Sequence, residues 1–432
     1  MTLAKYSLGI GDRFGAEGEA QLRALQQAEA LGVEVVPVWN KSNREHSIIG
    51  TVPSDTRREA DEAVRRCGWR RPYFVDADHI SRTTVDRFLD SSNFFTIDVA
   101  DAIGTPADAA STSAFLNAMR PFKGSLAVPG VKAPFEVTDA LLAAVAGKYL
   151  HAVEEAGRVY RYIAERKKGA EFVAEVSVDE ADSPQTPGEL FFILAALARE
   201  RIPLQTIAPK FTGSFLKGVD YVGDREKFTG EFEDDLAVIA HAVERFGLPA
   251  DLKLSVHSGS DKFSLYPIIH RAIKRANAGL HLKTAGTTWL EEVIGLAASG
   301  GDGLHAAQEV YARSFERYDE LCKPYLSVIS IDRRKLPSPA AVGRWSADEF
   351  LGALRHDQSC QQFNPHFRQL VHVGYKVAAE MGGRFTDLLG ACREAIETNV
   401  TMNIFDRHIR PLFLGSEAGV GSTRTPSASQ NA

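Results

Sequence analysis

The sequence is poor in the features that mark several large classes of protein. It has only four cysteines among 432 residues, and no two of them form a CxxC pair. Thiols so far apart argue against a disulfide framework and against a cysteine-based zinc site. We therefore expect free or buried thiols in a reducing, cytoplasmic environment.

Long apolar runs and an excess of basic charge are also missing. No apolar run reaches the roughly 20 residues of a membrane span, and the N-terminus lacks the apolar segment of a secretory signal. The net charge of -6 does not favour a nucleic-acid or anionic-membrane surface. No GxGxxG follows the first predicted strand and no GxxxxGKS/T occurs, so nucleotide binding has no motif support.

Residues 1–290 alternate apolar strands with helical stretches. Such alternation predicts a parallel sheet, and eight units of this kind have the size of a (β/α)8 TIM-like barrel. An open doubly wound sheet is the rival arrangement. The predicted strands cover residues 6–11, 33–39, 73–80, 94–101, 171–180, 203–210, 252–257 and 280–283.

The alternation stops after residue 290. Residues 291–413 have the apolar spacing of helices, which predicts a helical C-terminal region packed on the barrel. Such a region could close the barrel or form an interface with a second copy. Residues 414–432 are rich in Gly, Ser and Thr and nearly without large apolar groups, so we expect a disordered tail.

Polar side chains gather at the carboxyl end of every predicted strand. Barrel enzymes place their chemistry at this end, so the asymmetry supports the barrel. The polar groups are Asp12, Asn40, Asp78, Asp98, Asp179, Lys210, His257 and Lys283.

The last two predicted strands carry the groups that are most costly to bury. Lys253, Ser255 and His257 share one face of the first strand. His281 and Lys283 share one face of the second. Two histidines and two lysines on one side of neighbouring strands are expensive without a purpose, so we interpret them as half of an active site.

Three histidines near strand ends indicate a metal site. His79, His257 and His281, with one or two carboxylates, suit a borderline divalent cation such as zinc, manganese, cobalt or nickel. Each histidine alone is more often a hydrogen-bonded structural residue, and the spacing is not a compact motif such as HExxH. Their common position at strand ends is what favours a ligand role.

Two acidic residues are candidates for proton transfer. Asp78 lies in the run VDADH, which suits a base beside a metal and also a helix N-cap. Glu175 lies mid-strand, where an unpaired carboxylate would be expensive. Either it forms a salt bridge with Lys253 or Lys283, or it is a metal ligand or an acid/base with a shifted pKa.

Several cations lie at or just beyond predicted strand ends. Surface cations usually serve solubility only, whereas cations over one barrel mouth favour an anionic substrate such as a carboxylate or a phosphate. Lys210 or Lys283 could also form a Schiff base, as in an aldolase. Among the C-terminal histidines, His372 is the best placed to reach the site. The cations are Arg13, Lys41, Arg44, Lys210 and Lys283.

Nine stretches of the chain resemble the tagaturonate epimerase family, which interconverts tagaturonate and fructuronate in bacterial hexuronate breakdown. They span residues 6 to about 413, and such long stretches are far more specific than a three-residue pattern. The stretches are YSLGIGDRFG, PVWNKSNREHSIIG, YFVDADHI, FFTIDVAD, EVSVDEADSPQTP, KFTGSFLKGVDYVGD, SVHSGSDKFS, HLKTAGTTWLEE and HVGYKVAAE.

The resemblance implies a barrel-like fold, a divalent metal and roles for particular residues. Asp78 would be the proton acceptor next to the ligand His79, with His257 and His281 completing the metal set. Glu175 is our candidate for the second acid/base. The substrate carboxylate would then be bound by cations from the set Arg13, Lys41, Lys210 and Lys283.

The implied reaction inverts one carbinol carbon of a keto-uronate, and two routes lead there. A retro-aldol route breaks and re-forms a carbon–carbon bond, whereas a proton-transfer route first moves the carbonyl along the chain. The alternatives are a 4-epimerase of neutral ketoses such as tagatose and fructose, a metal-dependent sugar-acid aldolase, and a non-catalytic sugar-acid binding module.

Overall fold

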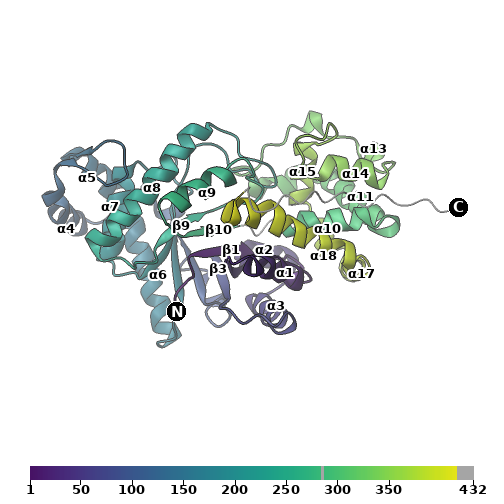
Figure 1. Ribbon diagram of the computed structural model, residues 1–432, viewed down its shortest axis with the longest axis horizontal. Coiled ribbons are helices and arrows are strands. Elements are labelled where there is room, and N and C mark those ends of the chain that lie inside the picture. Colours follow the sequence, from purple (N-terminus) through teal and green to yellow (C-terminus); the bar gives the residue numbers. More distant parts are fainter. Residues whose placement is uncertain (284–286, 416–432) are drawn as a thin grey trace.

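A closed barrel of eight parallel strands forms the centre of the molecule (Figure 1). The structure is a computed structural model that describes residues 1–283 and 287–415. The predicted (β/α)8 barrel is confirmed, and the open sheet is excluded. In barrel order the strands are β1 (Tyr6–Ile10), β10 (Leu280–Leu282), β9 (Lys253–Val256), β8 (Leu204–Ala208), β7 (Val173–Ser177), β4 (Phe94–Asp98), β3 (Phe74–Ile80) and β2 (Val36–Ser42).

The second predicted strand was placed too early in the chain. Its predicted end was residue 39, but β2 continues to Ser42 and α2 (Asn43–Ile49) follows at once. Ser42 and Glu45 form a capping box there, which stabilises the first turn of α2. Between β3 and β4 the chain forms a short 3₁₀ turn, η1 (Val85–Arg87).

Helices cover the outside of the barrel. Two of them begin at side-chain caps, which are Thr186 with Glu189 before α7 and Asp224 before α8. The helix α7 buries nearly every residue of its middle turns, because it lies between the strands and its neighbouring helices. The outer helices are α1 (Gly18–Ala30), α3 (Pro53–Arg66), α6 (His151–Lys167), α7 (Pro187–Arg199), α8 (Arg225–Phe246) and α9 (Tyr266–Arg275).

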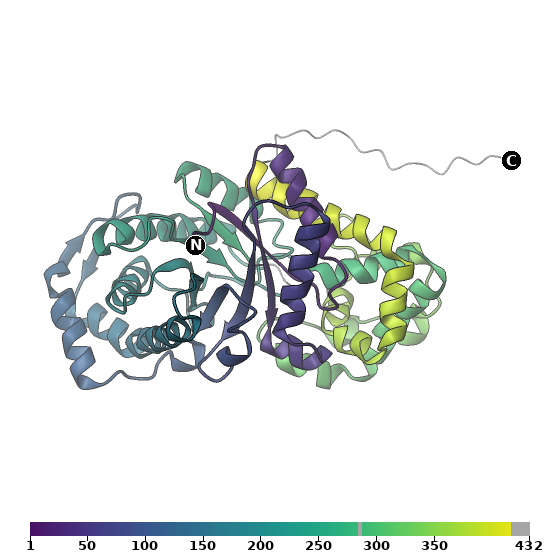
Figure 2. The same cartoon turned by 90° about the horizontal axis from the view of Figure 1, so that it is seen from below.

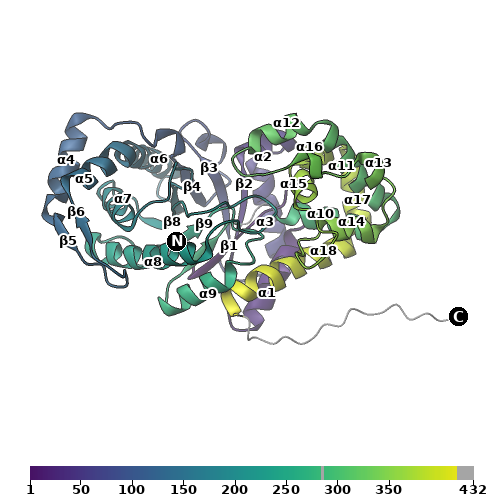
Figure 3. The same cartoon turned by 90° about the horizontal axis from the view of Figure 1, so that it is seen from above.

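A long insertion separates β4 from β7 and extends the molecule at one end (Figures 1 and 3). It contains a small antiparallel hairpin that was not predicted, because strands of three residues are too short to show a period of two. Its elements, after the short turn η2 (Ala100–Ala102), are α4 (Ala109–Met119), η3 (Arg120–Phe122), β5 (Gly124–Leu126), β6 (Phe135–Val137), α5 (Asp139–Val145) and the π-helical turn η4 (Ala146–Leu150) that leads into α6.

The C-terminal helices form the other end of the molecule (Figures 1 and 3). The last of them returns to the barrel and packs against α1 and α9, which Figure 2 shows from below. These elements are α10 (Thr287–Ala298), α11 (Gly301–Glu316), α12 (Tyr318–Cys322), η5 (Lys323–Tyr325), η6 (Arg333–Lys335), α13 (Pro339–Val342), α14 (Ala347–Leu354), α15 (Pro365–Val373), α16 (Tyr375–Glu380), α17 (Gly383–Ala391), α18 (Arg393–Met402) and η7 (Asn403–Leu414).

Three further expectations concern single features of the chain. All four cysteines are free, as predicted. Within the described ranges, no helix is both long and apolar enough to cross a membrane. The predicted tail of residues 414–432 lies, apart from its first two residues, outside the described residues.

Candidate active site

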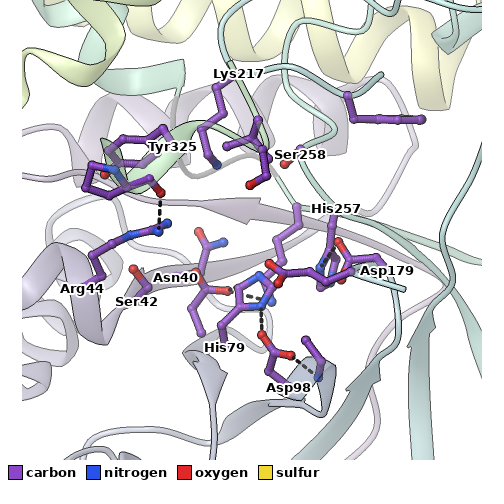
Figure 4. Close-up of a pocket in the computed structure, with 18 of the residues that line it drawn as sticks. Asn40, Ser42, Arg44, His79, Asp98, Asp179, Lys217, His257, Ser258 and Tyr325 are labelled. Atoms are coloured by element: carbon purple, nitrogen blue, oxygen red, sulfur yellow. Dashed lines mark hydrogen bonds and ion pairs between the residues drawn. The ribbon is translucent and has the colours of Figure 1, made fainter. Parts of the chain in front are cut away.

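A pocket of about 800 Å³ lies at the carboxyl ends of the barrel strands. Residues from the C-terminal region, among them Tyr325 and His372, line it together with the barrel, so both parts of the chain build the site (Figure 4). Asp12 is not part of the lining; its carboxylate instead accepts hydrogen bonds from backbone N–H groups ahead of α1. The other predicted strand-end groups all line the pocket, namely Asn40, Asp78, Asp98, Asp179, Lys210, His257 and Lys283.

His79 reaches the pocket because β3 is irregular at this point. The pairing of β3 with β4 shifts between Ala77 and Ile80, and His79 has a φ of 51°. A regular strand would turn Asp78 and His79 to opposite faces, whereas here both line the pocket. The Nδ1 atom of His79 lies 2.9 Å from Asp98 Oδ2, and its Nε2 lies 3.8 Å from Asp78 Oδ1.

His257, just beyond β9, lies beside His79 with the two ring centroids 5.1 Å apart. Its Nε2 is 2.8 Å from Glu175 Oε1, and its Nδ1 is 3.4 Å from Asp179 Oδ2. Burial alone would lower the pKa of His257, but the carboxylates of Asp179 and Glu175 raise this pKa to about 10. The imidazole is therefore a cation in this arrangement, held between two carboxylates.

Lys283 stands at the centre of the charged cluster. Its Nζ lies 3.0 Å from Asp76 Oδ2, 2.9 Å from Asp78 Oδ1 and 3.2 Å from Glu175 Oε1. The Thr96 hydroxyl bridges Asp76 and Glu175 from the neighbouring strand. The salt bridge between Glu175 and Lys283 that the sequence indicated is therefore present.

These contacts lower the pKa of Asp78 and Glu175 but leave that of Asp76 raised. Burial would raise the pKa of Asp78, but Lys283 and His79 lower it to about 2. Burial raises the pKa of Asp76 to about 7, even with Lys283 acting against it. For Glu175, burial is outweighed by Lys283 and the histidines, which hold its pKa well below the usual range. Asp78 is thus ionised and able to accept a proton, although it is a weak base while the Lys283 contact persists.

His281 lies deeper in the barrel than the other two predicted ligands. It is fully buried, and its Nδ1 is 2.9 Å from Ser7 Oγ. Its ring lies 5.4 Å from that of Phe94, and burial lowers its pKa to about 3. The structure therefore brings His79 and His257 together at the pocket, and it leaves the neutral His281 below them.

Arg13 lines the pocket, whereas Lys41 supports it from behind. The Arg13 Nη2 pairs with Glu45 Oε1 at 3.1 Å, and its guanidinium lies 4.4 Å from the ring centroid of Tyr375. Lys41 is buried and donates from Nζ to the backbone carbonyl of Arg13 at 3.1 Å. Of these two predicted substrate-binding cations, only Arg13 faces the pocket.

Lys210 and Arg44 also line the pocket, and both already have partners. Lys210 donates from Nζ to the backbone carbonyl of Ala181. Arg44 donates to the carbonyl of Pro324 at 3.2 Å and lies over the ring of Tyr325, 4.7 Å from its centroid. Both cations therefore help to hold the walls of the pocket in place.

Several residues of the site were not assigned a role from the sequence. Asp98 and Asp179 orient the two histidines, and their positions at strand ends were the signal that could have identified them. Lys217, Ser258 and Tyr325 line the pocket from loops and a short turn. Such segments have no hydrophobic period, so periodicity gave no signal for these three residues.

The residue types around the two histidines are those that hold a borderline divalent cation, namely imidazoles and carboxylates. Within residues 1–283 and 287–415, no three His, Cys, Asp or Glu side chains are arranged as ligands around one point. Instead, His79 contacts Asp98, and His257 contacts Glu175 and Asp179. The donor set fits a metal by its chemistry, and binding would require His257 to exchange a carboxylate for the ion.

Comparison with known proteins identifies the family. Residues 1–389 match a sequence profile described as tagaturonate epimerase. The chain belongs to this family. A tagaturonate/fructuronate epimerase from Thermotoga maritima is 30% identical over 383 residues, which cover 85% of this chain and 72% of the relative. This tagaturonate epimerase family member is accordingly an epimerase, an isomerase by class.

Solved structures show the same fold. A glycerol-bound crystal structure of the fructuronate-tagaturonate epimerase from Cohnella laeviribosi matches with a TM-score of 0.78 and 24% identity. That match covers 95% of this chain and 82% of the other. The native crystal structure of the Cohnella laeviribosi protein matches with a TM-score of 0.76, again at 24% identity and with the same shares of the two chains.

Proposed function

We propose that this protein interconverts D-tagaturonate and D-fructuronate and that it requires a divalent metal ion. The family match and the name of the Thermotoga maritima relative support the substrate pair. The observation that carries the proposal is the cluster at the barrel mouth. There His79 and His257 line one pocket with the ionised Asp78, so metal-binding and proton-accepting groups face the same space.

The metal would be held by His79 and His257 with a carboxylate from Asp98, Asp179 or Glu175. When bound, it would supply a Lewis acid that polarises the oxygen atoms of the sugar. The carboxylates that now contact the two imidazoles would orient them toward the ion, as outer partners do in many metal sites. His281 has no part in this set, because it lies below the pocket beside Ser7.

Asp78 is the proposed base in either route. In the retro-aldol route it takes the hydroxyl proton, the carbon–carbon bond breaks, the aldehyde turns, and the bond re-forms on the other face. In the proton-transfer route it takes and returns a carbon-bound proton. Glu175, which contacts both His257 and Lys283, is the proposed second acid/base. Lys283 keeps Asp78 ionised at neutral pH.

The test is conversion of tagaturonate in deuterated water, followed by NMR. The purified protein is stripped of metal and reloaded with manganese, zinc, cobalt or nickel, and the stripped protein is the control. We expect fructuronate with at least one metal and none without. Product free of carbon-bound deuterium supports the retro-aldol route, and incorporated deuterium supports proton transfer. No conversion with any metal would contradict the proposal and favour the neutral-ketose alternative.

A further inference from the structure

The cations that line the pocket differ in how far they are already engaged. Arg13 is paired with Glu45 at 3.1 Å, Lys283 contacts three carboxylates, and Lys210 donates to a backbone carbonyl. Lys217 also lines the pocket, but its Nζ forms no hydrogen bond or ion pair with the described part of the chain. Its ammonium group points into the pocket from the side opposite His79 (Figure 4).

The backbone around Lys217 is fixed before any ligand binds. Its N–H donates to the carbonyl of Val328 in the C-terminal region at 2.8 Å. The fully buried Arg368 donates from Nε to the carbonyl of Gly218 at 2.6 Å. The buried Lys262 donates from Nζ to two further carbonyls of the same loop, both at 2.8 Å. A cation on so well-held a loop is preorganised for binding, which lowers the entropy cost of ordering it.

The surroundings of Lys217 favour an anionic ligand. Burial lowers the pKa of Lys217, while the carboxylates of Glu45 and Asp78 act in the opposite direction. A carboxylate that binds beside Nζ would offset the desolvation of the ammonium group and form a charge-assisted hydrogen bond. A hydroxymethyl group at the same place could accept a hydrogen bond but would leave the charge uncompensated.

The pocket has carboxylate and imidazole groups on one side and an ammonium group on the other. Asp78, His79 and His257 gather at the strand ends, and Lys217 faces them from the loop after β8. We propose that Lys217 binds the carboxylate of the sugar acid and makes the pocket select keto-uronates over neutral ketoses. This inference rests on the proposed function for the identity of its substrate. It also assigns a role to the C-terminal region, which holds the loop through Val328.

The test is the equilibrium binding of tagaturonate and of tagatose to the metal-loaded protein, measured by calorimetry for the wild type and for Lys217→Met. The control is Lys227→Met, an exposed lysine on α8 outside the pocket. The backbone contact of Lys217 with Val328 survives a side-chain change, so the loop should keep its place. Thermal unfolding of each variant checks that the fold is intact.

We expect Lys217→Met to weaken tagaturonate binding roughly 10- to 100-fold, as loss of a charge-assisted hydrogen bond implies, and to leave tagatose binding within about twofold. Unchanged tagaturonate binding, or an equal loss for both sugars, would overturn the inference.

Turnover is measured in parallel. If wild type binds tagaturonate through Lys217 without converting it, the proposed function fails and the inference stands. If the wild type converts tagaturonate and Lys217→Met binds tagaturonate normally, the proposed function stands and the inference fails.

Discussion

The interior of the barrel has two layers of opposite character, built from neighbouring positions of the same strands. The layer toward the amino ends is apolar and consists of Leu3, Val36, Val38, Phe74, Phe94 and Val173. The layer above it is charged and hydrogen-bonded and consists of Asp76, Thr96, Glu175 and Lys283. A step of two residues along a strand thus separates the apolar layer from the charged one, and the charged layer reaches the pocket through Lys283.

Two buried lysines have pKa values that are shifted in opposite directions. Lys253, at the amino end of β9, donates to the backbone carbonyls of Leu3 and Ala4 at 2.9 and 2.6 Å. Burial lowers the pKa of Lys253 to about 8. For Lys283, burial acts in the same direction, but the surrounding carboxylates raise its pKa well above the usual value. Burial is similar for the two lysines, so the partner groups decide the direction of the shift.

The largest effect is expected from Asp78→Asn, with Asp76→Asn as the control, because Asp76 lies two residues earlier on β3 and does not line the pocket. Asp78 lines the pocket and is the proposed base, so its amide should lower kcat roughly 10²- to 10⁴-fold while the metal stays bound. Asp76 does not line the pocket, and its amide should cost less than about tenfold. Initial rates and metal content of both variants check this. Equal losses in kcat would contradict a special role for the carboxylate that lines the pocket.

A comparably large effect on metal binding is expected from His257→Ala. Because His257 is a proposed ligand, the metal content per molecule of folded protein should fall to a small fraction in this variant. Turnover should be lost with the metal. His281→Ala should keep the metal, since His281 lies below the pocket. Elemental analysis of the purified variants decides between them. Full metal occupancy in His257→Ala, or an empty site in His281→Ala, would contradict the proposed ligand set.

Replacement of Lys283 should lower the free energy of unfolding much more than replacement of Lys253. Lys283→Met leaves three buried carboxylates without their cation, which should cost about 3–5 kcal/mol in the free energy of unfolding. Lys253→Met loses only hydrogen bonds to two backbone carbonyls and should cost roughly 1 kcal/mol. Urea unfolding at pH 7 measures both. Similar costs for the two variants would mean that the carboxylates do not depend on Lys283.

The smallest predicted effect is a pH dependence that originates in Lys253, at the amino end of β9. The folded pKa of Lys253, about 8, is below its unfolded value near 10.4, so the unfolded chain binds more protons between these pH values. The contribution of Lys253 to stability should therefore rise between about pH 8 and 10.4, by on the order of 2–3 kcal/mol. The difference in unfolding free energy between wild type and Lys253→Met measures it. A difference that stays constant over this range would contradict the lowered pKa.

The barrel could be predicted because its strands carry regular patterns. Each predicted strand is present, and the polar groups at the strand ends, Asp12 apart, do converge on one pocket. Because successive side chains of a strand point to opposite faces of the sheet, the sequence was enough to place Glu175 in the barrel interior beside Lys283. The regular pattern of strands and helices was therefore enough to predict the barrel and the contact between Glu175 and Lys283 in its interior.

The details that escaped prediction depend on contacts between distant segments. The irregularity of β3 that turns His79 into the pocket leaves no mark in the sequence pattern. The depth of His281 in the barrel follows from the stagger of neighbouring strands, which a single strand cannot reveal. Lys217 is held through Val328, more than a hundred residues away in the chain, so only the folded structure shows it at the site.

The most direct test of the proposed activity is a competition between the two candidate substrate classes. The metal-loaded protein receives equal amounts of tagaturonate and tagatose, and both product pairs are followed by NMR over time. We expect fructuronate to form while tagatose is consumed at least about 10-fold more slowly, because a carboxylate gains a charge-assisted contact that a hydroxymethyl group lacks. Faster formation of fructose than of fructuronate would contradict a keto-uronate epimerase.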